Sequence, residues 1–302
     1  MNHSFNWGRF WLISIPFIWL LVFFLLPFII VVKMSLSDMA NAMPPYVPTL
    51  DLTQGWSSLM EYLKQLDFEN YSFLMDDELY VLSYLSSLKI ALISTFLTLL
   101  VGYPLAYGMA KMPEKWRPIL LMMVILPFWT SFLIRVYSWI GILKGDGLLN
   151  STLMALGLIN EPLVIMNTTT AVYIGIVYSY LPFLVLPLYA TLEKIDHSLL
   201  EAAADLGASP MKAFWQITFP MSLPGVVAGA FLVFIPAMGE FVIPDLLGGS
   251  ETLMIGKTLW EEFFGNRDWP LASAVAVALL LLLVIPILFF QRMQEKQQEA
   301  NS

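Results

Sequence analysis

The sequence has no cysteine, only two histidines, and few charged residues. Without cysteine the chain can form no disulfide, thiolate nucleophile or Cys-based metal site, and two histidines offer little imidazole chemistry. Charged residues make up 13% of the chain, against roughly a quarter in soluble proteins. These shortages argue against a metalloenzyme and against a soluble globular domain, and no metal site is expected.

Hydrophobic residues are correspondingly abundant, at 58% of the chain. Crossing a hydrocarbon core about 30 Å thick takes roughly 20 apolar residues in a helix, and six charge-poor segments approach or exceed that length. The third contains Arg135, whose long side chain could reach the membrane interface from near a helix end. The composition predicts an all-α membrane protein with one transmembrane domain, 1–302. Its expected spans are 10–36, 82–110, 118–143, 168–192, 213–240 and 269–291.

The distribution of lysine and arginine predicts the orientation of these spans. Eight of the fifteen lie in the two terminal segments and in the short loops on the same side of the membrane, which places both termini in the cytoplasm. The formal charge is then +1 inside and −9 outside, summing to the net −8. The acidic outer loops, including the long loop 37–80, could attract cations. They could equally be solvated segments that are merely poor in basic residues.

Prolines and glycines interrupt several of the predicted spans. The tripeptide Leu-Pro-Phe occurs at 26–28, 126–128 and 181–183, and a Pro/Gly cluster over 236–244 also contains Glu240. Broken helices leave backbone groups unpaired, and at membrane depth these persist only beside protein or a watery cavity. A single proline kink is common in spanning helices, but the cluster around Glu240 favours a solute pathway over a simple anchor.

The predicted cytoplasmic loop 193–220 contains the signals for two short helices. Asp196 can cap the first helix, Gly207 can end it in a left-handed conformation, and Ser209 can cap a second helix that begins with Pro210. Two lysines against four carboxylates provide no basic surface for phosphates, so nucleic-acid binding is not expected. The apolar face expected for the first helix consists of Leu199, Leu200, Ala203 and Leu206.

The same loop resembles the EAA loop of bacterial ABC importer permeases. That pattern is EAA, three residues, Gly, nine residues, then I-x-L-P, and only Phe219 departs from it, conservatively. In that family the loop forms a coupling helix seated in a cleft of the ATPase, which implies an ATPase-coupling role here. The matching positions are Glu201, Ala202, Ala203, Gly207, Ile217 and Pro220.

Further segments, 125–137, 239–249 and 266–270, resemble polyamine permeases of the putrescine type. The resemblance implies a type I ABC importer permease fold, a second similar permease subunit forming a heterodimer, a cytoplasmic ATPase dimer and a soluble external polyamine-binding protein. The chain itself is expected to bind no cofactor and to be no enzyme, because ATP and Mg belong to the partner ATPase. The sequence Gly256-Lys257-Thr258 imitates the end of a phosphate-binding loop, but Glu251 occupies the place of its first glycine.

We expect transport by alternating access, with Gly207 as the pivot. A carboxylate among broken apolar helices is costly unless paired or functional, so Glu240 is the best candidate for binding an ammonium group, and an ion pair with Arg135 is the competing interpretation. Weaker candidates for the substrate pathway are Asp245, Trp129, Tyr137 and Tyr178.

Three alternatives stay open at this point. The importer could carry another small cationic or polar solute. A secondary transporter or channel would need no motor, but it would also have no reason to carry the EAA pattern. An intramembrane enzyme would need convergent catalytic groups, and only Glu240 and Arg135 come into question.

Overall fold

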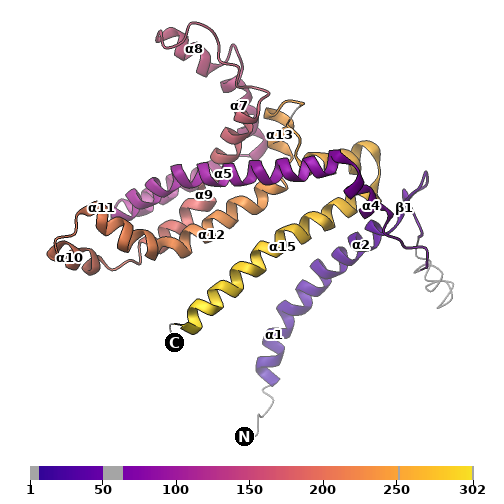
Figure 1. The fold of residues 1–302 in the computed structure, drawn as a ribbon, viewed down its shortest axis with the longest axis horizontal. Coiled ribbons are helices and arrows are strands. Elements are labelled where there is room, and N and C mark those ends of the chain that lie inside the picture. The colour runs from indigo at the N-terminus through magenta and orange to yellow at the C-terminus, as the bar shows by residue number, and fades with distance from the viewer. Residues whose placement is uncertain (1–6, 50–63, 251, 301–302) are drawn as a thin grey trace. The chain divides into compact units, whose positions relative to one another are not determined.

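The computed structural model describes residues 7–49, 64–250 and 252–300, so part of the predicted outer loop 37–80 lies outside the described residues. Within these ranges the regular elements are helices, apart from one two-stranded hairpin (Figure 1). They group into two compact units, residues 1–81 with 258–302, and residues 82–257. Each unit is described by itself.

The first unit combines the N-terminal helices with the C-terminal helix. Helix α15 packs against α2, α4, η5 and β1. The strands pair antiparallel, with Asp38 opposite Val47 and Met39 opposite Tyr46. The elements are α1 (Trp7–Leu20), the π-helix η1 (Leu21–Leu25), α2 (Leu26–Ser35), β1 (Asp38–Met39), β2 (Tyr46–Val47), α4 (Glu69–Asp76), the π-helix η5 (Glu261–Asn266) and α15 (Trp269–Ala300).

A buried carboxylate organises the start of α15 in this unit. Glu262 is 9% exposed and accepts hydrogen bonds from the Tyr80 hydroxyl and the Asn266 amide, each at 2.8 Å. Asp268 accepts from the Leu271 N–H at 2.9 Å and so caps the first turn of α15. The carboxylates are therefore used to join and cap helices.

The second unit is built around the packing of α12 on α9. Gly229 allows the close approach, because a Cβ at this position would lie 2.9 Å from the Leu184 carbonyl oxygen and 3.1 Å from its Cα. The elements are α5 (Glu78–Lys111), which begins in the first unit, α6 (Arg117–Ile125), the 3₁₀-helix η3 (Leu126–Trp129), α7 (Phe132–Leu143), α8 (Leu148–Ala155), α9 (Thr169–Leu192), α10 (His197–Asp205), α11 (Pro210–Ala213), the π-helix η4 (Phe214–Thr218), α12 (Phe219–Met238), α13 (Val242–Leu247) and α14 (Ile255–Trp260), which ends in the first unit.

The segment predicted as one continuous span over 118–143 is broken. Helical structure stops at Trp129, Thr130 is extended, and α7 starts at Phe132, so that the two helical parts are bent by 90°. Pro127 supports the break because it supplies no N–H to a helical ladder. The bend places Arg135 on a separate short helix, where its side chain is buried rather than extended to an interface.

Four helices of the described chain are long and apolar enough to cross a membrane, and counting the bent pair as one span gives five. A shorter apolar helix, Trp269–Ile285, lies in the position of the sixth predicted span. The structure thus confirms a mostly helical membrane protein, and the count of six spans remains a prediction. The four long helices are Leu12–Ser35, Glu78–Lys111, Thr169–Leu192 and Pro210–Met238.

Candidate functional site

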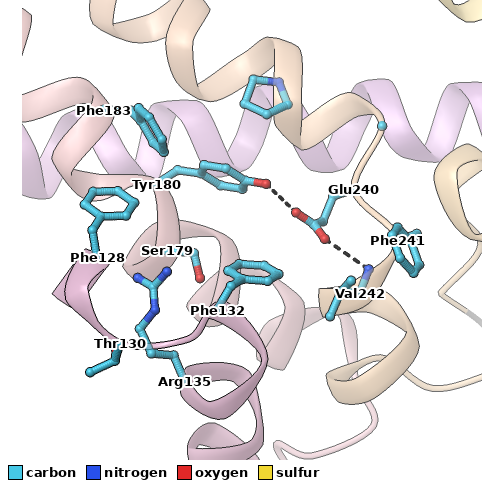
Figure 2. A pocket seen from close by; sticks show the side chains of 12 residues that line it. Phe128, Thr130, Phe132, Arg135, Ser179, Tyr180, Phe183, Glu240, Phe241 and Val242 are labelled. Carbon is cyan, nitrogen blue, oxygen red and sulfur yellow. Dashed lines mark hydrogen bonds between the residues drawn. The ribbon is translucent and has the colours of Figure 1, made fainter.

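A cavity of about 640 Å³ lies in the second unit where several broken helices meet. Its walls come from η3 and the start of α7, from the middle of α9, and from the junction between α12 and α13 (Figure 2). Aromatic rings dominate the lining, and Glu240 and Arg135 contribute charge. The lining residues are Phe128, Thr130, Phe132, Arg135, Ser179, Tyr180, Phe183, Pro236, Gly239, Glu240, Phe241 and Val242.

Glu240 lies at the turn between α12 and α13 and is 6% exposed. One carboxylate oxygen accepts from the backbone N–H groups of Val242 at 3.0 Å and Ile243 at 3.3 Å, and the other accepts from the Tyr180 hydroxyl (Figure 2). Three donors therefore offset part of the cost of burying this carboxylate. Its position at the start of α13 explains the backbone contacts, since the first N–H groups of a helix have no intrahelical partner.

Arg135 lines the same cavity and is 9% exposed. Its guanidinium lies over the rings of Phe128 and Phe132, at 5.3 and 5.7 Å from their centroids. Its Nε and Nη1 atoms have no hydrogen-bond partner among the described residues. The partners of the Glu240 carboxylate are Tyr180, Val242 and Ile243. Figure 2 shows this carboxylate separated from the Arg135 guanidinium, so the competing expectation of an Arg135–Glu240 ion pair is not met in this structure.

The aromatic wall continues along α9. Phe183 packs edge-on against Phe128 at a centroid distance of 5.1 Å and lies 6.0 Å from the ring of Tyr180. Such faces can contact a methylene chain and attract a cation. The cavity thus combines one hydrogen-bonded carboxylate with apolar ring surfaces.

Of the five pathway residues predicted from the sequence, the structure places one, Glu240, in the cavity lining. Asp245 is on α13 and pairs with Lys257 at 3.4 Å. Tyr178 packs its ring against Trp139. Trp129 and Tyr137 are 75% and 58% exposed in this chain and are not among the lining residues.

Sequence reasoning missed Tyr180, Ser179 and the phenylalanines of the wall. One signal was available, because two of the three Leu-Pro-Phe tripeptides supply Phe128 and Phe183, which contact each other in the cavity wall. The third tripeptide, at 26–28, lies in the first unit. A repeated tripeptide alone could not show which two copies face each other.

The loop 193–220 has the predicted local structure. Asp196 accepts from the Ser198 N–H at 2.9 Å at the start of α10, and Ser209 accepts from the Lys212 N–H at 3.3 Å at the start of α11, whose first residue is Pro210. Gly207 has φ +80°, the left-handed conformation expected of it. Both predicted caps and the predicted glycine turn are confirmed.

The surface of α10 differs from the expected apolar face. Ala203 is buried, but Leu206 is 89% exposed and Leu199 is 41% exposed, so the apolar residues do not form one buried stripe. Glu201 and Ala202 are exposed beside them. The helix therefore presents a mixed surface of small, apolar and acidic residues outward.

The remaining two residues of the EAA pattern follow this helix in the chain, in η4 and α12. Ile217 is half-buried in η4, and Pro220 is at the second position of α12. The structure places both at the entry of α12, where they can position the loop on the span that carries Glu240 at its other end.

An open cavity lined by broken apolar helices, together with an outward two-helix loop, fits a membrane transport subunit. The chain belongs to the family of binding-protein-dependent transport system inner membrane components, whose pattern it matches over residues 99–299.

Similar proteins extend the match to nearly the whole chain. The chain is 40% identical over 280 residues to the spermidine/putrescine transport system permease protein PotB of Haemophilus influenzae, covering 93% of this chain and 92% of the relative. It is 42% identical over 274 residues to the PotB protein of Escherichia coli K12, covering 91% and 93%. A more distant relative, the permease protein YdcU of Escherichia coli K12, is 30% identical and covers 69% of this chain and 70% of the relative.

Solved structures agree on the fold. A bacterial ABC transporter that imports the polysaccharide alginate contains a chain that superposes with a TM-score of 0.66 at 17% identity, with 96% of both chains covered. The MetNI methionine ABC transporter, in an inward-facing conformation, gives 0.53 at 19% identity, with 70% of this chain and 93% of that chain covered. At these identities the likeness shows a shared ABC importer permease fold.

Proposed function

We propose that this chain is the permease subunit of an ATP-driven importer of polyamines, with putrescine as the preferred substrate, and that it works by alternating access. The single observation that carries the proposal is the cavity that joins the Glu240 carboxylate to aromatic walls. Its volume of about 640 Å³ lies within the range of roughly 300 to 1,000 Å³ typical of small-molecule sites. The relatives named for spermidine and putrescine transport support the same substrate class.

A polyamine carries ammonium groups separated by methylene chains, and the cavity offers a counterpart for each. Glu240 can accept hydrogen bonds from an ammonium group while the Tyr180 hydroxyl and α13 hold the carboxylate in place. The rings of Phe128 and Phe183 can cover the methylene chain. Cation–π contacts in such a desolvated site contribute roughly 0.5 to 2 kcal/mol each.

The proposed assembly has three further components. A dimeric ATPase, which binds the ATP and Mg, docks on the exposed surface of α10 around Glu201; a second, similar permease forms a heterodimer with this chain; and a soluble external protein delivers the polyamine. The chain is a multi-pass protein of the bacterial inner membrane, and both termini lie in the cytoplasm. This orientation agrees with the lysine and arginine distribution and puts α10 on the ATPase side.

The test is uptake of radiolabelled putrescine by cells that depend on this chain, with all partner subunits present. We expect Glu240→Gln to lower uptake at low substrate concentration by at least tenfold, and Asp245→Asn, which changes a carboxylate outside the cavity, to lower it less than twofold. Equal uptake by the Glu240→Gln variant and the unsubstituted chain would contradict the assignment of the cavity. Both variants must reach the membrane in equal amounts, which immunoblotting of membrane fractions checks.

A competition measurement and inactivation of the ATPase separate the remaining alternatives. Unlabelled putrescine should inhibit uptake at lower concentration than spermidine, and the reverse order would make spermidine the preferred substrate. Inactivating the partner ATPase should abolish uptake. Persistence of uptake without ATP hydrolysis would instead favour a secondary transporter.

A further inference from the structure

The cavity contains buried hydrogen-bond donors that no described residue satisfies. Nε and Nη1 of Arg135 are buried and have no hydrogen-bond partner among the described residues, and the same holds for the hydroxyl of Ser179, which is 3% exposed. Both residues line the cavity, and Figure 2 shows the Ser179 hydroxyl and the Arg135 guanidinium on the same side of it. Leaving such groups unpaired in a membrane protein is costly, and most of all for a guanidinium.

The Glu240 carboxylate, the charged acceptor in the cavity, already has hydrogen-bond partners. Glu240 receives hydrogen bonds from Tyr180 and from two backbone N–H groups, and its contacts do not include Arg135. The rings of Phe128 and Phe132 stabilise the positive charge of Arg135 but accept no conventional hydrogen bond. The described residues therefore supply no hydrogen-bond partner for Nε and Nη1 of Arg135.

The transported molecule cannot be that partner. Protonated polyamines present ammonium groups, which only donate hydrogen bonds and carry the same charge as Arg135. The group that fits is a carboxylate, because its two oxygens match the fork of a guanidinium and leave a lone pair for a neighbouring hydroxyl.

The surface beside the cavity indicates where such a carboxylate resides. Next to Arg135 on α7, Leu133, Ile134 and Tyr137 are 50%, 64% and 58% exposed, and Trp129 on η3 is 75% exposed. A protein surface covering these residues would bring its own side chains to the cavity mouth.

We propose that an aspartate or glutamate of the second permease subunit enters this cavity and pairs with Arg135 and Ser179. The inference rests on the proposed function, which supplies the second subunit. Its consequence is electrostatic: in this chain alone the charges of Glu240 and Arg135 sum to zero, −1 + 1 = 0. The partner's carboxylate makes the sum −1, so the cavity favours a cation only in the assembled pair.

The first experiment maps what lies beside Arg135. The photoreactive residue p-benzoylphenylalanine replaces Arg135 in the full complex, expressed with its ATPase, second permease and binding protein. The matched control is Val136, which is adjacent on α7 and 1% exposed. We expect irradiation to join this chain to the second permease from position 135 and not from position 136, with the adduct mapping within one helical turn of an Asp or Glu.

The second experiment tests the pairing itself. Arg135→Glu should reduce copurification of the second permease by about tenfold or more, as expected when a buried charge loses its partner. Substituting Lys for the mapped carboxylate should restore copurification with Arg135→Glu but reduce it with the unsubstituted chain. Rescue of this kind would not occur if Arg135→Glu simply misfolded.

Several results would overturn the inference. An adduct from position 135 to lipid or only within this chain, an equal adduct from position 136, or an adduct far from any acidic residue would each do so, as would absence of rescue by charge reversal. The same experiments show separately whether the proposed function holds. If a second permease copurifies and polyamine is taken up while these tests fail, only the inference is wrong; if no second permease copurifies at all, both fail.

Discussion

Tyr180 and Glu240 join two helices of the second unit across the cavity, because the Tyr180 hydroxyl on α9 donates to the carboxylate at the junction of α12 and α13. The same carboxylate caps α13 through Val242 and Ile243. The Glu240 side chain thus connects the junction of α12 and α13 to α9, the helix that packs against α12. Any cation that binds Glu240 must compete with, or add to, this set of donors.

Removing the Tyr180 hydroxyl should therefore change substrate affinity. A lost hydrogen bond to a buried charged group costs about 1.5 to 3 kcal/mol, so we expect Tyr180→Phe to shift the apparent KM for uptake by roughly 10- to 100-fold at unchanged membrane abundance. Tyr178→Phe is the matched control, because Tyr178 contacts Trp139 through its ring and does not line the cavity. Equal KM values for both variants would show that the Tyr180–Glu240 contact has no role in binding.

The exposed helix α10 provides a prediction about coupling. Glu201→Lys reverses an exposed charge on the proposed ATPase-docking surface and should abolish uptake while the protein remains inserted in the membrane. Glu114→Lys, an exposed reversal in the loop before α6, should leave uptake within about twofold, since isolated surface charges contribute little to stability. Normal transport by Glu201→Lys would disprove the coupling assignment.

At Gly207, at the end of α10, the effect of backbone conformation can be tested without a steric clash of the added side chain. Its φ of +80° is unfavourable for residues with a Cβ, although a Cβ would meet no atom within 4 Å. The strain of a left-handed alanine is roughly 1 to 2 kcal/mol, so Gly207→Ala should reduce substrate-stimulated ATP hydrolysis and Gly207→Asn should reduce it less. Gly207→Pro should abolish uptake. Identical activities for Ala, Asn and Gly would mean that the left-handed turn is not needed for coupling.

The sequence predicted the coupling loop better than the cavity, for a physical reason. Caps and glycine turns depend on neighbours within a few residues, so Asp196, Gly207 and Ser209 could be interpreted locally. The cavity brings together residues far apart in the chain, and the positions of Tyr180 and Phe128 depend on how α9 packs against the broken third helical segment. Burial of Glu240 could be anticipated from its apolar surroundings, but its hydrogen-bond partners could not.

The break at Thr130 also could not be predicted from the local sequence. Hydropathy over 118–143 is continuous, so composition alone favours one span, and Pro127 by itself is compatible with a kink. Only the packing of α7 against α9 and α13 shows that the segment turns by 90°. That turn converts Arg135 from an expected interfacial residue into a cavity residue.

The contact between α9 and α12 should be sensitive to a single methyl group. A Cβ at Gly229 would lie within 3.1 Å of the Leu184 backbone, which cannot yield as a side-chain tip can. Overpacking typically costs about 1 to 3 kcal/mol, so Gly229→Ala should lower the Tm of the detergent-solubilised protein by several degrees. Gly108→Ala in α5 is the control, because nothing lies within 4 Å of its added Cβ. A Tm drop of equal size in both variants would point to a general helix effect.

We expect the stability of the protein to depend on pH through Asp268, at the start of α15. Burial raises the pKa of Asp268 above its ordinary value, the neighbouring Glu262 acts in the same direction, and the hydrogen bond from Leu271 opposes them. A raised folded-state pKa favours the protonated form, so this contribution is fully present below the unfolded pKa of about 3.9 and is lost as pH rises through the folded value.

Asp268→Asn removes the titration while keeping a residue that can cap α15 through its side-chain oxygen. Between pH 4 and pH 7 we expect the Tm of the unsubstituted protein to fall relative to that of Asp268→Asn, with the largest difference at pH 7. The measurement is thermal unfolding in detergent across this range, with the exposed Asp205→Asn as the control for a general loss of negative charge. A constant Tm difference across the range would show that Asp268 titrates alike in the folded and unfolded states, and that burial at the α15 cap is not what sets its pKa.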